Sequence, residues 1–311
     1  MYFRQIEYIL AVSELRNFGQ AADRCAITQS TLSTMIGRFE DEIGIRIFNR
    51  KTKPVSVTKE GEQLLGQLRI ISKEVYNFRE VVKDLKGELS GSLKIGVIPT
   101  LAPYLLPHFL QEFISRFPTV HFEISEITTD KIIQKIEQRE LDIGLVSIPL
   151  DNPQLQEIHL FDEPFLLYDQ VAAEMEGNST IQEIDFERLW LLEEGHCMRT
   201  QAETICGLRE KQPTSRNLEY KSGTIDTLMK YVRKNEGVTL LPYLATLELA
   251  EQEHTYLQAF EEPVPARSIG LVVHQHFVKK RLLKYLKDEI IEKVNSLMVG
   301  KFDSLRMVSP I

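Results

Sequence analysis

The sequence predicts an α/β protein with a largely helical N-terminal part and a two-lobed α/β C-terminal part, on three observations. Up to about residue 90, apolar residues recur mainly with helical spacing. From Leu93 onward, short apolar runs alternate with helical stretches, which is typical of sheets covered by helices. The chain has 311 residues, of which 43% are hydrophobic, so it can bury more than one core. We therefore expect two or three domains.

The first residues show the pattern of a helix-turn-helix. The small residues Ala21 and Ala22 let two helices cross closely, and a short turn follows at residues 26–28. Apolar residues then recur at spacings of four, three and four over residues 32–43, which indicates a second helix. In this motif the N-terminal part of the second helix enters the major groove of DNA, although polar residues can also simply face water. The candidate DNA contacts are Gln29, Ser30, Thr31, Ser33, Thr34 and Arg38.

A basic wing is predicted next, because residues 45–48 and 55–58 alternate like two strands. Between Arg46 and Lys59 the chain has five basic residues and no acidic one. Residues 1–60 carry 9 Lys+Arg and 7 Asp+Glu, a net +2, whereas the whole chain carries −8. This local charge suits contact with DNA phosphates, with a solvated surface loop as the alternative. The candidate phosphate contacts are Arg50, Lys51 and Lys53.

A long helix follows, for which Thr58 is a candidate cap. Its apolar residues are spaced 4, 3, 4, 3, 4 and 3, a heptad pattern that favours pairing between two subunits over packing on its own domain. Paired recognition helices would then read two half-sites of a roughly palindromic operator. Residues 87–91 break the helix and form a hinge. The predicted dimer seam consists of Leu64, Leu68, Ile71, Val75, Phe78, Val82 and Leu85.

The C-terminal pattern predicts two sheets, arranged as in periplasmic binding proteins. Three apolar runs separated by helical stretches indicate a first parallel sheet, at residues 93–97, 120–124 and 141–146. Three later runs would form a second sheet before residues 269–273 return to the first, at residues 165–168, 189–192 and 237–242. A cleft at the carboxyl ends of these strands would be lined by residues 98–100, Thr128, Thr129 and Cys197. We thus expect a winged helix-turn-helix domain at residues 1–60, a linker helix with hinge at 61–91, and a two-lobed regulatory domain at 92–311.

Two of the three cysteines, Cys197 and Cys206, lie nine positions apart. On one helix they would be about 13 Å apart along the axis and on opposite faces, whereas a disulfide needs Cα atoms within roughly 7 Å. If the intervening segment is helical when reduced, joining the sulfurs must remodel it, which would be a two-state switch. His196 and Arg199 could favour a thiolate at Cys197. The alternative is that both are ordinary buried cysteines, as we expect for Cys25.

The whole chain resembles the LysR-type transcriptional regulators, and in particular their peroxide-sensing members. The resemblance rests on residues 98–100, 103–108, 161–164, 192–202 with Cys206, 239–242 and 269–272. It implies that Cys197 reacts with peroxide, that Cys206 resolves the product, and that the pocket includes Thr100, Thr129, His196, Arg199, Thr200 and Arg267. Thr200 departs from the pattern, because the peroxide sensors often carry an acidic residue there that assists proton transfer. We therefore expect a slower reaction with peroxide, and it stays open whether a hydroxyl or a water replaces the acid.

The resemblance implies a transcriptional regulator, not an enzyme, that needs no cofactor or metal and controls oxidative-stress genes through a reversible Cys197–Cys206 disulfide. Its expected partners are double-stranded DNA, hydrogen peroxide, RNA polymerase and further copies of the chain, as a homodimer or the homotetramer usual in the family. No run of about 18 apolar residues and no apolar signal core occur. We therefore expect no membrane contact and a cytoplasmic protein, where a disulfide is more often transient than structural.

Four rival interpretations remain. The same fold could sense a small metabolite in the cleft, with incidental cysteines. A thiol peroxidase would use the same cysteine chemistry but would have no use for the helix-turn-helix. A periplasmic solute-binding protein shares the two lobes but would need a signal peptide. His274 and His276 could suggest a metal site, but two histidines without further clustered ligands are more often surface residues.

Overall fold

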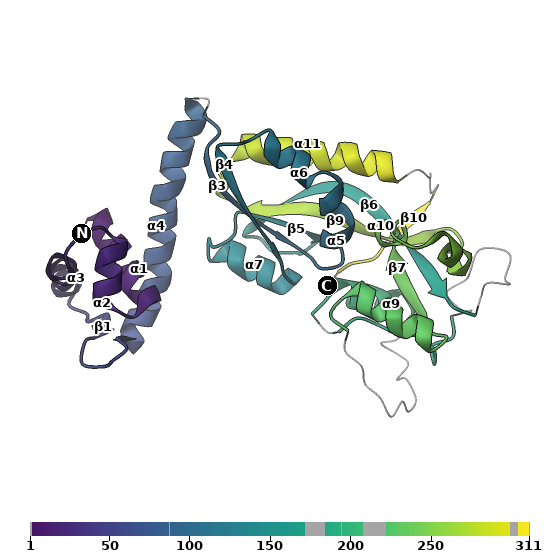
Figure 1. Cartoon of the computed structure of the whole chain (residues 1–311), viewed down its shortest axis with the longest axis horizontal. Helices are drawn as coiled ribbons and strands as arrows, with labels where there is room; N and C mark the ends of the chain where they lie inside the picture. The colour runs from purple at the N-terminus through teal and green to yellow at the C-terminus, as the bar shows by residue number, and fades with distance from the viewer. Residues whose placement is uncertain are drawn as a thin grey trace. The chain divides into compact units, whose positions relative to one another are not determined.

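Figure 1 shows the computed structural model of the chain. It describes residues 2–86, 88–171, 184–193, 195–207, 222–298 and 304–310. It divides into two compact units, residues 1–87 and 88–311. Gly87 of the expected hinge lies outside the described residues. No described helix is long and apolar enough to cross a membrane.

The first unit is a helix-turn-helix with a short hairpin and a long helix. Its elements are α1 (Phe3–Leu15), α2 (Phe18–Arg24), α3 (Gln29–Ile43), β1 (Phe48–Asn49), β2 (Ser56–Val57) and α4 (Lys59–Leu85). Asn17 caps α2 and Thr28 caps α3, because their side chains accept hydrogen bonds from backbone N–H groups of the first turn. Thr58 caps α4 as expected, since its hydroxyl accepts from Gly61 N at 2.9 Å. Ala21 and Ala22 are buried in the shared helical core. The predicted helix-turn-helix is confirmed.

The wing strands are shorter than predicted. Only Phe48↔Val57 and Asn49↔Ser56 pair, so residues 45–47 do not join the hairpin. The backbone N–H groups of Ile47 and Phe48 instead donate to the carboxylate of Glu40 on α3, at 2.8 and 3.1 Å. A buried side-chain acceptor thus takes the place of a partner strand.

The heptad seam on α4 behaves in two ways. Leu68 is buried, and Leu64 and Ile71 also pack against the core of their own unit. Toward the other end of the helix, Phe78 is 69% exposed and Leu85 is 82% exposed. The first part of the seam therefore packs on its own domain, contrary to the simple dimer expectation, while the second part presents apolar side chains outward.

The second unit is built on eight strands in the order β4-β3-β5-β9-β6-β7, with β10 beside β9 and β8 beside β6. In Figure 1, α11 and α6 lie along one face of the first sheet and α7 along the other. The strands are β3 (Gly91–Val97), β4 (Val120–Glu126), β5 (Ile143–Ile148), β6 (Leu155–Asp169), β7 (Val238–Pro242), β8 (Leu257–Gln258), β9 (Val264–His274) and β10 (Leu305–Met307). The helices are α5 (Ala102–Leu105), η1 (Leu106–His108), α6 (Leu110–Ser115), α7 (Thr129–Glu137), α8 (Cys197–Ile205), α9 (Ile225–Lys234), α10 (Tyr243–Thr246), η5 (Glu251–Tyr256) and α11 (Lys280–Leu297).

The expected parallel sheets are corrected to mixed ones. Strands β3, β4 and β5 are parallel, but β9 runs antiparallel to both β5 and β6. The single strand β6 pairs with β9 through Pro164 and with β7 from Phe165 onward, so it belongs to both sheets. The expected strand at residues 189–192 forms only isolated bridges, from Leu189 and Leu192. The α/β fold with two joined sheets is otherwise as predicted.

Helix α7 packs closely on the first sheet because glycines face it. A Cβ on Gly144 would lie 2.4 Å from the Ile132 side chain, and one on Gly96 would lie 3.0 Å from it. The contact at Gly144 is too short for a real side chain and the one at Gly96 is unusually tight, so the two glycines permit this close approach. This packing fixes Thr129, the first residue of α7, beside the ends of the strands.

Candidate functional site

Helix α8 carries one cysteine at each end. Cys197 is its first residue and is 7% exposed, while Cys206 is the C-cap and is 4% exposed. All three cysteines, including Cys25, are free thiols. The predicted helix between Cys197 and Cys206 is confirmed, and their spacing of nine positions separates them by about 13 Å along the axis. A disulfide between them therefore requires α8 to unwind.

The surroundings of the Cys197 thiol act in opposite directions. Burial is the largest effect and raises its pKa above the ordinary value. Against this, the charge of Arg267, the hydroxyl of Thr129 and the backbone N–H groups of Cys197 and Met198 favour the thiolate and lower its pKa. The first turn of a helix presents such N–H groups without helical partners. The resting site therefore keeps the thiol protonated and has donors in place for the anion.

Arg267 is fully buried in a polar network. Its Nη1 donates to Thr100 Oγ1 at 2.8 Å, and its Nη2 donates to the Thr100 carbonyl at 3.1 Å. Its Nη2 also lies 2.8 Å from Oε2 of Glu163, whose side chain is fully buried as well. Because Thr100 follows β3 whereas Glu163 and Arg267 face each other on β6 and β9, the network joins three segments.

Two of the expected thiolate-stabilising groups act otherwise. Burial lowers the pKa of His196, against the opposing effects of Glu193 and Glu126, so the imidazole is neutral at neutral pH. Arg199 donates to Glu203 Oε1 at 2.8 Å and to the Leu192 carbonyl at 3.0 Å. His196 is therefore neutral and Arg199 is paired with Glu203, whereas Arg267 is a cation that lowers the pKa of the Cys197 thiol.

Cys206 lies in a different environment from Cys197. Burial alone raises the pKa of its thiol to about 12. Cys206 is therefore unreactive where it lies, and it can take part in chemistry only after its surroundings change.

Thr200, also on α8, is partly exposed, and its carbonyl accepts a hydrogen bond from Thr204 Oγ1 at 2.8 Å.

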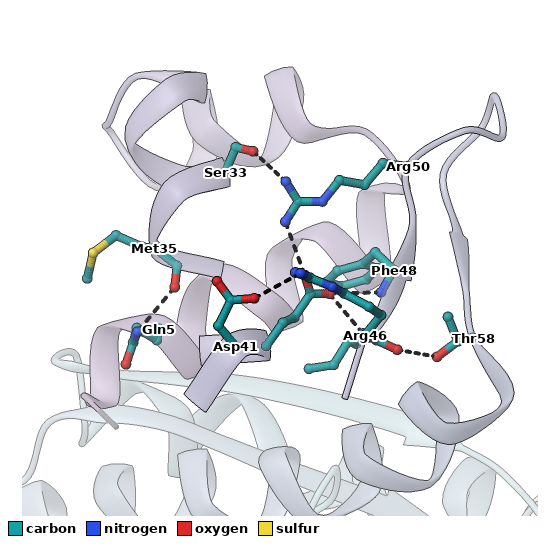
Figure 2. A network of polar contacts seen from close by, with 10 residues as sticks. Gln5, Ser33, Met35, Asp41, Arg46, Phe48, Arg50 and Thr58 are labelled. Atoms are coloured by element: carbon teal, nitrogen blue, oxygen red, sulfur yellow. Dashed lines mark hydrogen bonds and ion pairs between the residues drawn. The ribbon is translucent and has the colours of Figure 1, made fainter. Parts of the chain in front are cut away.

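The candidate DNA-binding residues lie mainly exposed on α3 and the wing. Gln29, Ser30, Thr31, Thr34 and Arg38 are exposed on α3, and Lys51 and Lys53 are exposed on the wing. Ser33 is partly buried and accepts a hydrogen bond from Arg50 Nη1 at 2.8 Å, as Figure 2 shows.

Arg50 links the wing to α3. Its Nη2 lies 3.2 Å from Oε2 of the buried Glu40, and its guanidinium lies 5.1 Å from the centre of the Phe18 ring. The same carboxylate oxygen accepts from Arg46 at 3.2 Å. Arg50 is therefore held in place by its own domain, with 40% of its side chain exposed.

The comparisons with known proteins agree on one family. The family described as bacterial regulatory helix-turn-helix protein, lysR family, matches residues 3–62, and the LysR substrate binding domain matches residues 86–294. The DNA-binding transcriptional dual regulator OxyR of Escherichia coli K12 is 31% identical over 307 residues, which cover 98% of each chain. The chain belongs to the LysR family of transcriptional regulators.

Further relatives of this LysR-family regulator have related names. A hydrogen peroxide-inducible genes activator from Haemophilus influenzae is 29% identical over 305 residues, 96% of this chain and 99% of its own. A full-length OxyR variant from Pseudomonas aeruginosa has a TM-score of 0.73 at 28% identity and covers 93% of this chain and 94% of its own. The predicted family and fold are confirmed.

One polar residue of the LysR-family sensor site was not predicted. Gln201, one turn after Cys197 on α8, is fully buried, and its Nε2 donates to Ser147 Oγ at 3.1 Å and to the Val308 carbonyl at 2.9 Å. Its Oε1 and Thr129 Oγ1 have no well-formed hydrogen bond with any residue the structure describes. Buried polar atoms of this kind suit a small polar ligand. The spacing of four from Cys197 was the signal in the sequence.

A metal site has no support in the described ranges. No three His, Cys, Asp or Glu side chains of those residues gather as metal ligands. The rings of His274 and His276 stack with centroids 5.4 Å apart.

Proposed function

We propose that this LysR-family regulator senses hydrogen peroxide through a reversible Cys197–Cys206 disulfide and controls the transcription of oxidative-stress genes. The observation that carries the proposal is the placement of two buried thiols at the two ends of α8, with Arg267 and Thr129 acting only on the first. The relatives named for OxyR and for peroxide-inducible genes support it.

In the first step, the Cys197 thiol loses its proton and the thiolate sulfur attacks one oxygen of peroxide. The S–O bond forms, the O–O bond breaks, and hydroxide leaves and takes up a proton to become water. Thr100, Thr129 and Arg267 would stabilise the charge that develops on the leaving oxygen. Cys197 becomes a sulfenic acid.

In the second step, the deprotonated sulfur of Cys206 attacks the sulfur of Cys197. The S–S bond forms, the S–O bond of the sulfenic acid breaks, and the oxygen leaves as hydroxide, which takes up the proton that Cys206 lost and becomes water. Since α8 holds the sulfurs apart, this step needs the helix to unwind. A thiol reductant that regenerates both thiols would reset the switch.

The DNA side of the proposal uses the first unit. Gln29, Ser30, Thr31, Ser33, Thr34 and Arg38 on α3, with Arg50, Lys51 and Lys53 of the wing, would contact DNA. The exposed Phe78 and Leu85 on α4 would pair with a second copy, and dimers would associate further into tetramers. A change in α8 would alter contacts between regulatory domains (residues 92–311) and hence the spacing of the DNA-binding domains (residues 1–60) through the linker (residues 61–91).

Three further parts of the proposal follow from this role. RNA polymerase is the partner that reads out the altered DNA complex. The chain would act in the cytoplasm, where the bacterial chromosome lies. It would bind and react with peroxide stoichiometrically, and would not be an enzyme that turns peroxide over.

Peptide mass mapping after brief exposure to low peroxide tests the chemistry. We expect a Cys197–Cys206 link while Cys25 stays a thiol. If both cysteines stay reduced, or Cys197 passes straight to sulfinic acid, the proposal fails and a metabolite-sensing LysR-family regulator replaces it. Repeated rapid turnover with a thiol donor would instead indicate a peroxidase.

A further inference from the structure

We propose that Glu163 is a positioning residue of the Cys197 site, which holds the Arg267 guanidinium against Thr100 and offsets its charge beside the thiol. This inference rests on the proposed function, since it concerns how the same site reacts. The sequence pointed to Arg267, Thr100 and Cys197 but gave Glu163 no role.

The geometry fixes Arg267 from one side. Glu163 and Arg267 are directly opposite each other on β6 and β9, and both side chains are fully buried. Glu163 Oε2 accepts from Arg267 Nε at 2.9 Å and lies 2.8 Å from Nη2. Because the guanidinium is planar, gripping Nε and Nη2 determines where Nη1 points.

Nη1 points toward the sensor site. It donates to Thr100 Oγ1 at 2.8 Å, while Nη2 also donates to the Thr100 carbonyl at 3.1 Å. A guanidinium has five N–H donors. The hydrogen bonds use one donor on each of Nε, Nη1 and Nη2, and Nη2 is also in ion-pair contact with Glu163. Nη1 carries two hydrogens and makes one hydrogen bond to the residues that the structure describes, so the group retains donor capacity for a ligand.

Glu163 is itself held from outside the pair. Its Oε1 accepts from the backbone N–H of Leu244 on α10 at 2.8 Å. Both carboxylate oxygens therefore have partners, and a rotation of Glu163 would break a bond to α10 as well as the pair with Arg267. The orientation of Arg267 is thus set by β6 and α10, elements far from α8 in the sequence.

The negative charge of Glu163 limits how strongly the positive charge of Arg267 favours the Cys197 thiolate. A buried arginine with no anionic partner would act on Cys197 with its whole charge and favour the thiolate strongly. The neighbouring His196 is neutral, and the carboxylates of Glu193 and Glu126 act on its imidazole. With Glu163 in place, burial outweighs Arg267 and the pKa of Cys197 is raised. The thiol would then ionise when a reactant is bound, and resist other oxidants until then.

The test isolates Cys197 in the full-length chain with Cys25→Ser and Cys206→Ser. Glu163→Gln keeps the shape and the acceptor for Leu244 but removes the charge. The pH dependence of Cys197 alkylation by iodoacetamide should move about one unit lower, which means about tenfold more thiolate at a given pH below the transition. Glu163→Ala should also slow peroxide oxidation per thiolate, and Glu163→Asp should restore part of that rate.

Asp142→Asn is the matched control. Asp142 is a buried carboxylate of the same unit, pairs with Lys279 at 2.9 Å and accepts from Lys94 N at 3.0 Å, so it repeats the contacts of Glu163 elsewhere. Its loss should destabilise the fold without moving the Cys197 profile. An unchanged profile in folded Glu163→Gln, or the same shift in Asp142→Asn, would overturn the inference.

If Glu163→Gln does not fold, the double variant Glu163→Gln/Arg267→Gln removes both charges. Its Cys197 profile should move to higher pH because the cation nearer the thiol is gone, and an unmoved profile would again contradict the inference. Alkylation needs no peroxide. If Cys197 of the unmodified protein proves inert to peroxide, the proposed function fails while the alkylation profiles still decide the role of Glu163.

Discussion

Two buried glutamates, one in each unit, make the same kind of pair with arginine, but the arginine is exposed in one unit and buried in the other. Glu40 on α3 and Glu163 on β6 both have fully buried side chains that accept backbone N–H groups and pair with arginine. The arginines of Glu40 reach the surface, where the Arg50 side chain is 40% exposed and the Arg46 side chain 64% exposed. Arg267 is enclosed with its partner.

The exposure of the paired arginine determines which kind of ligand each unit can contact. A surface cation held by a buried anion keeps its direction yet remains open to a large polyanion in solution. An enclosed cation can act only on a group inside the protein, such as the Cys197 thiol or a small molecule beside it. The same type of contact would thus serve both the proposed DNA interface and the proposed reactive site.

Cys197→Ser should have the largest effect, because it should abolish the peroxide response of the second unit and leave DNA binding by the first unit intact. Without its sulfur the second unit has no nucleophile, so we expect the peroxide-dependent change in the DNA footprint to disappear. Basal affinity for DNA should stay within about twofold, because the first unit is unchanged. Footprinting with and without peroxide measures both, and a variant that still switched would remove Cys197 from the mechanism.

The pH dependence of oxidation should reflect the enclosed site. Burial raises the pKa of Cys197 above its ordinary value of 9.0, so the reactive thiolate is a minor species at neutral pH. The rate of peroxide oxidation should therefore rise between pH 7 and 8.5, by roughly tenfold per unit. His196 has a lowered pKa and should add no inflection in this range. Stopped-flow oxidation of a Cys25→Ser variant would measure the profile, and a flat profile would mean that Cys197 reacts as a preformed thiolate.

Glu40→Ala should show how much the buried anion of the first unit stabilises the wing. The N–H groups of Ile47 and Phe48 would lose their acceptor, at a cost of about 2–4 kcal/mol in the free energy of unfolding. Glu40→Gln, which retains an acceptor, should cost less than half of that. Urea unfolding of the two variants provides the comparison, and equal losses would mean that the charge matters more than the hydrogen bonds.

The smallest effect should come from the wing cations. Lys51→Ala should weaken DNA binding a few-fold and reduce the slope of log K against log salt by about one, since one phosphate contact is lost. Its melting temperature should not change. Arg50→Ala should lower both the affinity for DNA and the melting temperature, because Arg50 also anchors the wing to Ser33 and Glu40. Identical behaviour of the two variants would contradict the distinction between an anchored and a free-standing cation.

Much of the fold could be predicted from local pattern. The apolar spacing between Leu32 and Ile43 indicated α3, and Thr58 indicated the start of α4, because helical periodicity and capping depend on residues within a few positions of each other. The strand at residues 189–192 and the length of the wing were wrong for the opposite reason. Pairing there depends on distant partners, such as Glu40, that local spacing does not reveal.

The sequence by itself determined the helix-turn-helix, the basic wing, the heptad seam and the nine-residue spacing that makes α8 incompatible with a resting disulfide. The strand pattern also predicted Thr100 and Thr129 as cleft residues, and resemblance to the family added Arg267. Only the tertiary structure showed that the charge of Arg267 acts on Cys197, that Glu163 pairs with Arg267, and that Gln201 is buried on α8. These contacts join residues up to 167 positions apart. They depend on strand register and burial, which the chain acquires only when the sheets assemble.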